Sequence, residues 1–378
     1  MSLNFGMRCS TVVPNKPPLT EQNLPDQKGK VFLVTGASGG LGQLLVDILY
    51  RHNGKVYLAA RSQSKTEEVI QEIKSAHPSS TGELHFLHLD LDDLSTIKPA
   101  ATRFLEKESR LDVLWNNAGV MIPPEGSKTK QGYELQYGVN NITHFLLTLL
   151  LRPALEAAAA SAPKNSVRVV WVASSAADAA PNPAVDLTNM DYHREGAWMK
   201  YSRSKAASVI HSAEFAQRTK GTGIISLALN PGNFVTNLQQ NMSKMELAMF
   251  KLISSDPING AYTELWTVSM VNVTGFEGGL GQVGVHAYTP GTQAARDHPQ
   301  LSADITFPAT SFWTKSLRLQ AGIVQPYRIA PQLINLISSG VANTSFITTA
   351  VINIEDAPEY YKRFNRTEEV KVLISFSR

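Results

Sequence analysis

A tyrosine and a lysine stand four residues apart in the segment "YSRSK", at Tyr201 and Lys205. On a helix this spacing places both side chains on one face. A tyrosine ordinarily has a pKa of ~10, and a nearby ammonium group lowers that pKa because it favours the ionised form. A phenol tuned in this way can pass a proton to or from a substrate oxygen. The pair is therefore a candidate for general acid/base chemistry.

Hydroxyl groups that could hold a substrate carbonyl lie upstream of this pair. The segment "ASS" at 173–175 follows the apolar run "VRVVWV", which is typical of a buried strand. Open α/β sheets bind ligands at the carboxyl ends of their strands. These serines are therefore expected to lie where a substrate would meet Tyr201.

The glycine cluster "TGASGGLG" at 35–42 has the context of a dinucleotide-binding loop. It follows the strand-like "KVFLV" and opens the helical "LGQLLVDILYRH". Gly36 permits a tight turn after the strand, Gly40 lets the backbone approach a pyrophosphate, and Gly42 lets helix and strand pack closely. The helix N-terminus then offers free N–H groups and a positive dipole end to the phosphates.

A second cluster, "GLGQVG" at 279–284, has the fingerprint spacing in a different context. It precedes the strand-like "QVGVHAY" instead of following a strand, and no helix opens after Gly284. We interpret it as a glycine-rich approach to a strand. The chain is therefore expected to hold one nucleotide cofactor.

The residue after the second expected strand indicates which cofactor this is. The strand "KVYLAA" ends before Arg61, where a carboxylate would accept a free 2′-hydroxyl. A guanidinium suits a 2′-phosphate, and Ser62 could add a hydroxyl. The sequence predicts NADP(H); a solvent-facing arginine at a strand end is the alternative.

Six apolar runs alternate with five amphipathic stretches, and this order must position the groups named above. It predicts an α/β fold of the Rossmann type, a doubly wound parallel sheet with helices on both faces. The strands are expected at 30–36, 55–60, 84–90, 111–117, 167–175 and 224–232. The helices are expected at 41–52, 65–76, 94–107, 131–160 and 199–219.

Changes in composition divide the chain into three regions. Residues 1–28 are polar and contain four prolines, which indicates a flexible or loosely docked N-terminal arm. Residues 29–270 form the expected Rossmann domain, and residues 271–378 a smaller α/β appendage. The elements expected in the appendage are strands near 316–321, 345–352 and 369–376 and helices near 329–339 and 355–364.

These motifs together resemble, in order, those of the classical short-chain dehydrogenase/reductase family over about residues 29–270. The motifs that carry the resemblance are "TGASGGLG", "LDLDD", "NNAG", "GVNNITHFLLT", "VASSAA", "YSRSK" and "NPGNFVT". The long spacing from serine to tyrosine is similar to the retinol-dehydrogenase-like branch, and the texture resembles fungal accessory reductases. The resemblance implies hydride transfer between NADP(H) and a small, largely apolar ketone, aldehyde or secondary alcohol, with secondary metabolism as the pathway.

The resemblance also implies a role for each site residue. Tyr201 would be the general acid/base, and Ser175, the second serine, would orient and polarise the carbonyl. Lys205 would lower the tyrosine pKa and bind the nicotinamide ribose, and Asn140 would hold a water that links Lys205 to solvent. The cofactor would be bound by Tyr201, Lys205 and Arg61 together with Gly36, Ser38, Gly40, Leu41, Gly42, Asp90, Asn117, Ala118, Gly119, Pro231, Gly232, Val235 and Thr236.

Residues 275–378 resemble instead the C-terminal part of a zinc-type medium-chain dehydrogenase/reductase. The segments that carry this likeness are "GGLGQVGVHAYTPG", "KSLRLQAGIVQP", "LINLISSGVANTSFI" and "IEDAPEYYKRF". That family's zinc-ligand motifs and cofactor loop are missing, so no metal is expected. The tail is a fragment, either a true fusion or an artefact of the gene model.

Composition narrows the function classes. A net charge of +3 without a basic run argues against nucleic acid as a partner. Cys9 is the single cysteine, which excludes a disulfide framework and favours a reducing, cytoplasmic setting. The apolar run "FLLTLLL" stops at Arg152 and Pro153, far short of the ~20 residues of a membrane span. A small-molecule substrate is the expected partner, and a homo-oligomer is compatible with the sequence.

The sequence leaves two alternatives to an active enzyme. One is a non-catalytic protein that binds or senses NADP(H), against which the complete set of serine, Tyr201 and Lys205 argues. The other is a reductase disabled by its tail, because the segment after Thr236 normally closes over substrate in the family that the chain resembles.

Overall fold

The structure is a computed structural model that describes residues 17, 19–181, 183–186, 188–192, 194–269, 350–353 and 372–375. The chain divides into two compact units, Met1–Phe307 and Pro308–Arg378, each of which is described by itself.

A parallel six-stranded sheet forms the centre of the first unit, with strand order β3-β2-β1-β4-β5-β6. The strands other than β3 are largely apolar, and β1, β4 and β5 are buried along their whole length. The change of direction between β1 and β4 is the point at which open α/β sheets bind ligands. The strands are β1 (Val31–Thr35), β2 (Lys55–Ala60), β3 (Glu83–His88), β4 (Val113–Asn116), β5 (Val167–Val172) and β6 (Ile224–Leu229).

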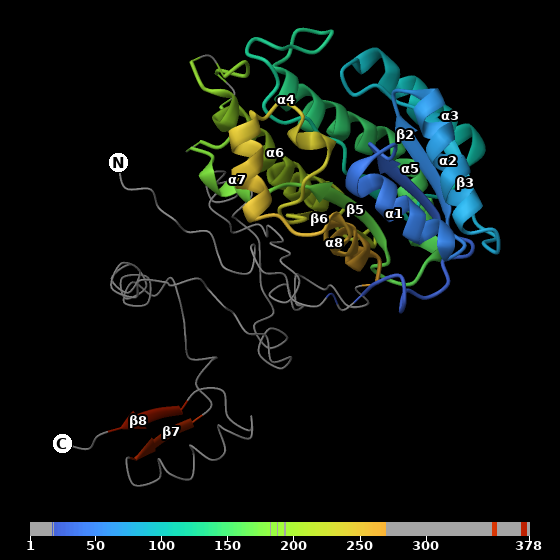
Figure 1. The fold of residues 1–378 in the computed structure, drawn as a ribbon. Coiled ribbons are helices and arrows are strands. Elements are labelled where there is room, and N and C mark those ends of the chain that lie inside the picture. Colours follow the sequence, from blue (N-terminus) through green and yellow to red (C-terminus); the bar gives the residue numbers. More distant parts are fainter. Residues whose placement is uncertain are drawn as a thin grey trace. The chain divides into compact units, whose positions relative to one another are not determined.

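Helices cover both faces of this sheet, as Figure 1 shows. One apolar layer joins the sheet to α1 (Gly40–Arg51), α2 (Gln63–Ala76) and α8 (Pro257–Ser269). The other joins it to α3 (Ile97–Lys107), α5 (Thr143–Ser161) and α6 (Ala197–Arg218). The predicted doubly wound Rossmann-type fold is confirmed.

The single long helix expected from residue 131 is wrong in its first third. Lys128 and Glu134 pair as an isolated β-bridge, and the short helix α4 (Leu135–Tyr137) follows. A π-helical turn, Gly138–Ile142, then leads into α5. Such turns occur frequently at functional sites, and this one carries Asn140.

The stretch Leu135–Ser161 is long and apolar enough to span a membrane by composition, and 44% of its most apolar window is buried inside the protein. In the fold α5 packs against α3 and the sheet through Leu147, Leu151 and Leu155. Pro153 lies inside α5 and does not end it. This is the packing of a core helix.

Two helices between residues 240 and 269 were not anticipated from the sequence. α7 (Lys244–Leu252) begins with a reciprocal capping box between Ser243 and Glu246. α8 lies against α1 and β5. Both follow the loop that leaves β6, and residues of α7 line the cleft at the ligand-binding edge of the sheet.

The last part of the N-terminal arm is docked instead of loose. Leu19 and Leu24 are buried in the α1/α8 layer. The Gln27 N–H donates to the His52 carbonyl at 2.8 Å, and the Tyr262 hydroxyl of α8 donates to Glu21.

In the second unit, β7 (Ala350–Asn353) and β8 (Val372–Ser375) pair in parallel. β8 lies within the strand expected near 369–376, and β7 overlaps only the end of the one expected near 345–352. The other elements expected in the appendage, and the "GLGQVG" cluster, lie outside the described residues.

Candidate active site

A cleft of about 1510 Å³ runs along the carboxyl edge of the sheet. It exceeds the ~300–1,000 Å³ of ordinary small-molecule pockets, so a dinucleotide and a second small molecule would both fit. Most of the residues expected to bind cofactor line it: Gly36, Ser38, Gly40, Leu41, Arg61, Asp90, Asn117, Ala118, Gly119, Tyr201, Lys205, Pro231, Gly232 and Thr236.

The glycine loop has steric reasons for its composition. Gly36 has φ +69°, and a Cβ there would stand 2.9 Å from the Ala118 Cβ. Gly40 has φ +59°, a conformation that favours glycine. Gly42 is buried outside the cleft lining, and a Cβ there would lie 2.9 Å from the Gly36 carbonyl oxygen. Gly42 thus has the close helix–strand packing expected of it.

Thr35 ties this loop to the segment after β4. Its hydroxyl accepts the backbone N–H groups of Asn117 and Ala118 at 2.9 and 3.0 Å. The Asn117 amide donates to the Thr35 carbonyl at 2.7 Å. On the far side Thr35 meets His144 Nε2 at 2.9 Å. Burial lowers the pKa of His144 to about 3, so this histidine is a neutral core residue.

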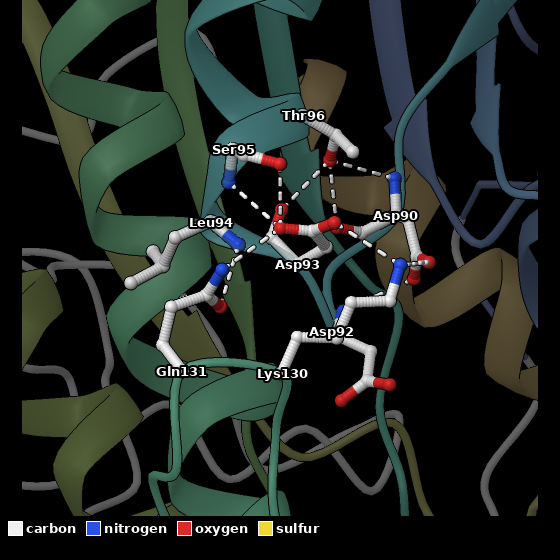
Figure 2. Close-up of polar contacts among 8 residues, drawn as sticks. All are labelled: Asp90, Asp92, Asp93, Leu94, Ser95, Thr96, Lys130 and Gln131. Atoms are coloured by element: carbon white, nitrogen blue, oxygen red, sulfur yellow. Dashed lines mark hydrogen bonds and ion pairs between the residues drawn. The ribbon is translucent and has the colours of Figure 1, made fainter.

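Asp93 organises the loop after β3, as Figure 2 shows. It accepts hydrogen bonds from Ser95, Gln131 and Lys130, which hold the pKa of its carboxyl well below the usual range. The Lys130 ammonium also lies 3.7 Å from the Asp90 carboxylate. Asp90 is therefore held in place where the loop lines the cleft.

Two cations face this end of the cleft. Arg61, exposed after β2, lines it. Burial and the Asp90 carboxylate raise the pKa of the neighbouring Asp92, and the charges of Lys130 and Arg61 act in the opposite direction. Lys65 lines it from the first turn of α2, and its Nζ lies 3.9 Å from where a Cβ on Gly39 would be. The sequence analysis did not identify Lys65; its spacing of four from Arg61 was the available signal.

The Tyr201 phenol forms a side-chain hydrogen bond with Ser174, and the assignment of Ser175 as the catalytic serine stays a prediction. Both serines line the cleft. Ser174 keeps the extended backbone of the strand, with φ −165° and ψ 156°, whereas Ser175 already begins a 3-10 turn. The last extended position thus carries the hydroxyl that reaches Tyr201.

Tyr201 is buried, and burial raises its pKa to about 12, against the lowering effect of the Ser174 hydrogen bond. That Lys205 lowers this pKa stays a prediction, since the effects found on Tyr201 are burial and the Ser174 hydrogen bond. The Lys205 Nζ lies 5.8 Å from the centre of the Tyr201 ring and donates to the Val172 carbonyl at 2.8 Å. At neutral pH the phenol therefore keeps its proton.

Lys205 is the buried cation of the site. Burial lowers its pKa to about 8, and the negative charge of Glu264 on α8 acts in the opposite direction. Gly119 lies close by, since a Cβ there would be 3.5 Å from the Lys205 Nζ. The segment after β4 and α6 thus meet at this ammonium group.

Asn140 stands behind the cleft lining and joins two of its walls. Its side chain accepts from the Val120 N–H at 2.9 Å and donates to the Val120 carbonyl and to Ser204 Oγ, both at 3.0 Å. Because Ser204 precedes Lys205 in α6, Asn140 fixes this helix against the loop after β4.

The loop after β6 closes the cleft. Gly232 has φ +113°, and Thr236 caps the turn that follows, with a reciprocal bond to Gln239. Val235 is half-buried and is not among the cleft-lining residues.

His211 is half-buried and stacks on Phe145 with ring centres 4.6 Å apart, and His193 lies outside the described residues. Among the residues that the structure describes, no cluster of three or more metal-binding side chains occurs.

The profile of the short chain dehydrogenase family matches residues 30–247. Short-chain dehydrogenase/reductase pkfC of Emericella nidulans is 55% identical over 259 residues, which are 68% of this chain and 83% of that relative. A short-chain dehydrogenase/reductase of Phomopsis amygdali is 48% identical over 68% of this chain and 78% of its own.

Solved structures share the fold. An uncharacterized protein from Mycobacterium Paratuberculosis has a TM-score of 0.55 at 27% identity, covering 78% of this chain and 95% of that one. The Pseudomonas aeruginosa RhlG/NADP active-site complex has a TM-score of 0.52 at 23% identity, covering 67% of this chain and 93% of its own.

Proposed function

Because the chain belongs to the short-chain dehydrogenase family and is therefore an oxidoreductase, we propose that it is an NADP(H)-dependent carbonyl reductase or alcohol dehydrogenase. Its substrate in this proposal is a small, largely apolar ketone, aldehyde or secondary alcohol. The observation that carries the proposal is the Ser174–Tyr201 contact beside Lys205, inside a cleft that begins at the glycine loop.

Each of these side chains has a chemical task in the proposal. Ser174, in place of Ser175, donates a hydrogen bond to the carbonyl oxygen. Tyr201, protonated at neutral pH because burial raises its pKa, gives its proton to that oxygen during reduction. A bound nicotinamide supplies the hydride that the carbonyl carbon takes up. Lys205 holds the cofactor ribose and stabilises the phenolate that is left, and Asn140 keeps Lys205 in place.

The cofactor fits the residues that are present. Glycine backbone at Gly39 and Gly40, at the N-terminus of α1, leaves room for phosphates and offers N–H donors. At the adenine end Arg61 and Lys65 support a 2′-phosphate, because a guanidinium and an ammonium together complement its charge. An acidic residue at 61 or 62 would favour NAD(H), and neither position carries one.

Dissociation constants of NADPH and NADH test this preference. One hydrogen bond to a charged group contributes ~1.5–3 kcal/mol, or roughly a 10- to 100-fold change in affinity. Arg61→Asp should therefore weaken NADPH binding at least 10-fold and leave NADH binding unchanged or stronger. Lys65→Ala should weaken NADPH binding in the same direction, whereas Lys74→Ala, on the same helix outside the cleft, should not. Equal affinity of the unaltered protein for both cofactors would refute the proposal.

We further propose a cytoplasmic role in secondary metabolism. The likeness to fungal short-chain dehydrogenases supports the pathway, and a single cysteine supports the reducing compartment. A fluorescent fusion found in a secretory compartment would contradict the location. A deletion strain with an unchanged profile of secreted small molecules would contradict the pathway.

A further inference from the structure

The segment "AWMK" before Tyr201 places a large aromatic side chain at the substrate end of the cleft. Trp198 lies in the first turn of α6 and lines the cleft. Its ring centre is 6.0 Å from that of Tyr201, with the planes at 78°. Trp198 is 48% exposed, although a tryptophan is usually mostly buried. Much of the indole surface therefore stands open beside the reacting phenol.

The position of Trp198 is fixed by the backbone around it. The Gln136 side chain, fully buried, donates to the carbonyl of Ala197 at 3.1 Å. Its Oε1 atom accepts from the Ile122 N–H at 3.0 Å. The first turn of α6 is therefore tied to the loop after β4, and Trp198 is held beside the site.

The wall formed by α7 is also apolar. Met249 is 65% exposed, and Phe250 and Ile253 line the cleft with it. The loop before α7 is joined to the segment after β4 by a hydrogen bond, which the Asn241 side-chain amide donates to the Met121 carbonyl at 3.4 Å. Thioether and aromatic side chains are adaptable partners for flat apolar molecules.

The charges along the cleft are unevenly distributed. Among the described residues that line it, the basic ones are Arg61 and Lys65 at the adenine end and the buried Lys205. The substrate end carries Asp178 and Glu246, both exposed. An anionic substrate would meet the like charge of these two carboxylates at the mouth of the cleft.

We propose that Trp198 is a specificity-determining platform on which an uncharged substrate with an aromatic ring stacks while its carbonyl oxygen faces Tyr201 and Ser174. This proposal rests on the proposed carbonyl oxidoreductase function and narrows its substrate class. Aromatic contact favours an aryl over a saturated ring of the same size by about 2- to 10-fold beyond the effect of buried area.

A matched pair of ketones isolates the ring from the reacting carbonyl. In 4-phenylbutan-2-one and 4-cyclohexylbutan-2-one the carbonyl is the same and two methylene groups separate it from the ring. The unaltered protein with NADPH should give a higher kcat/KM for the phenyl compound. Trp198→Ala should bring the ratio of the two values close to one, and Trp198→Phe should retain most of the preference. A para-carboxylate on the phenyl ring should lower kcat/KM at least 10-fold.

An unchanged ratio in Trp198→Ala, or equal use of the carboxylated ketone, would overturn the platform. If no ketone is turned over by the unaltered protein, the proposed function fails instead. Calorimetric binding of the two uncharged ketones to the cofactor-loaded protein then decides the platform alone. Tighter binding of the phenyl compound that disappears in Trp198→Ala supports it, and equal binding overturns it.

Discussion

Replacing Glu264 by glutamine should stabilise the protein, and the gain should grow as the pH rises. Glu264 on α8 is completely buried, and neither carboxyl oxygen has a hydrogen-bond partner among the residues that the structure describes. Burial raises its pKa from 4.5 to about 8, and the positive charge of Lys205 acts in the opposite direction. A neutral amide of the same shape cannot ionise, so the unfolded chain no longer gains stability by releasing a proton from this group.

The sign and size of the effect follow from proton linkage. The folded-state pKa is raised, so between pH 4.5 and about 8 the unfolded chain binds fewer protons and the unfolding free energy falls as pH rises. Between the unfolded-state pKa of 4.5 and about pH 7, the unfolding free energy falls by ~3 kcal/mol, at ~1.4 kcal/mol per pH unit. By about pH 5 it falls by less than ~1 kcal/mol. Glutamine does not titrate, so the unfolding free energy of Glu264→Gln should exceed that of the unaltered protein by about this amount at each pH.

Urea unfolding followed by tryptophan fluorescence, at about pH 5 and pH 7.5, measures the change. Glu68→Gln, at an exposed position of α2, is the matched control and should change the unfolding free energy little at either pH. A gain that is equal at the two pH values, or larger at the acidic one, would refute the reasoning.

Two further predictions concern the site and the glycine loop. Ser174→Ala should lower kcat by about 10²-fold or more, as expected for a group that stabilises the reacting oxygen, and Ser175→Ala should have a much smaller effect; the reverse order would restore Ser175 to the role. Gly42→Ala should lower the unfolding free energy by ~1–3 kcal/mol, because its Cβ would stand 2.7 Å from the Asn117 Nδ2 atom. Gly196→Ala is the control, since a Cβ there meets nothing within 4 Å, and equal stabilities of the two variants would show that α1 can move.

The sequence predicted the sheet because most of its strands are largely apolar runs that alternate with helical stretches. β1, β2 and β5 begin within one residue of the expected positions, and α1 opens at Gly40 as the glycine pattern requires. α7 was missed although Ser243 and Glu246 form a recognisable capping box. The apolar face of α7 is short and exposed, so the helical periodicity of its apolar residues was not recognised.

The details of the site depended on geometry that spacing does not contain. Ser174 and Ser175 are chemically identical, and the strand end decides which one reaches Tyr201. The raised pKa of Tyr201 depends on burial, which the motif does not report. In the sequence Glu264 is one polar residue in a helical segment. Only the packing of the folded chain shows that its carboxyl is buried near Lys205.

The measurement that tests the account most directly is NADPH-dependent reduction of a ketone panel by the protein and its Tyr201→Phe variant. The phenylalanine ring keeps the packing against Trp198 and removes only the hydroxyl that Ser174 contacts. The account predicts that turnover falls by at least ~10²-fold while the NADPH dissociation constant changes little. Retention of more than about a tenth of the activity would show that Tyr201 is not the proton donor.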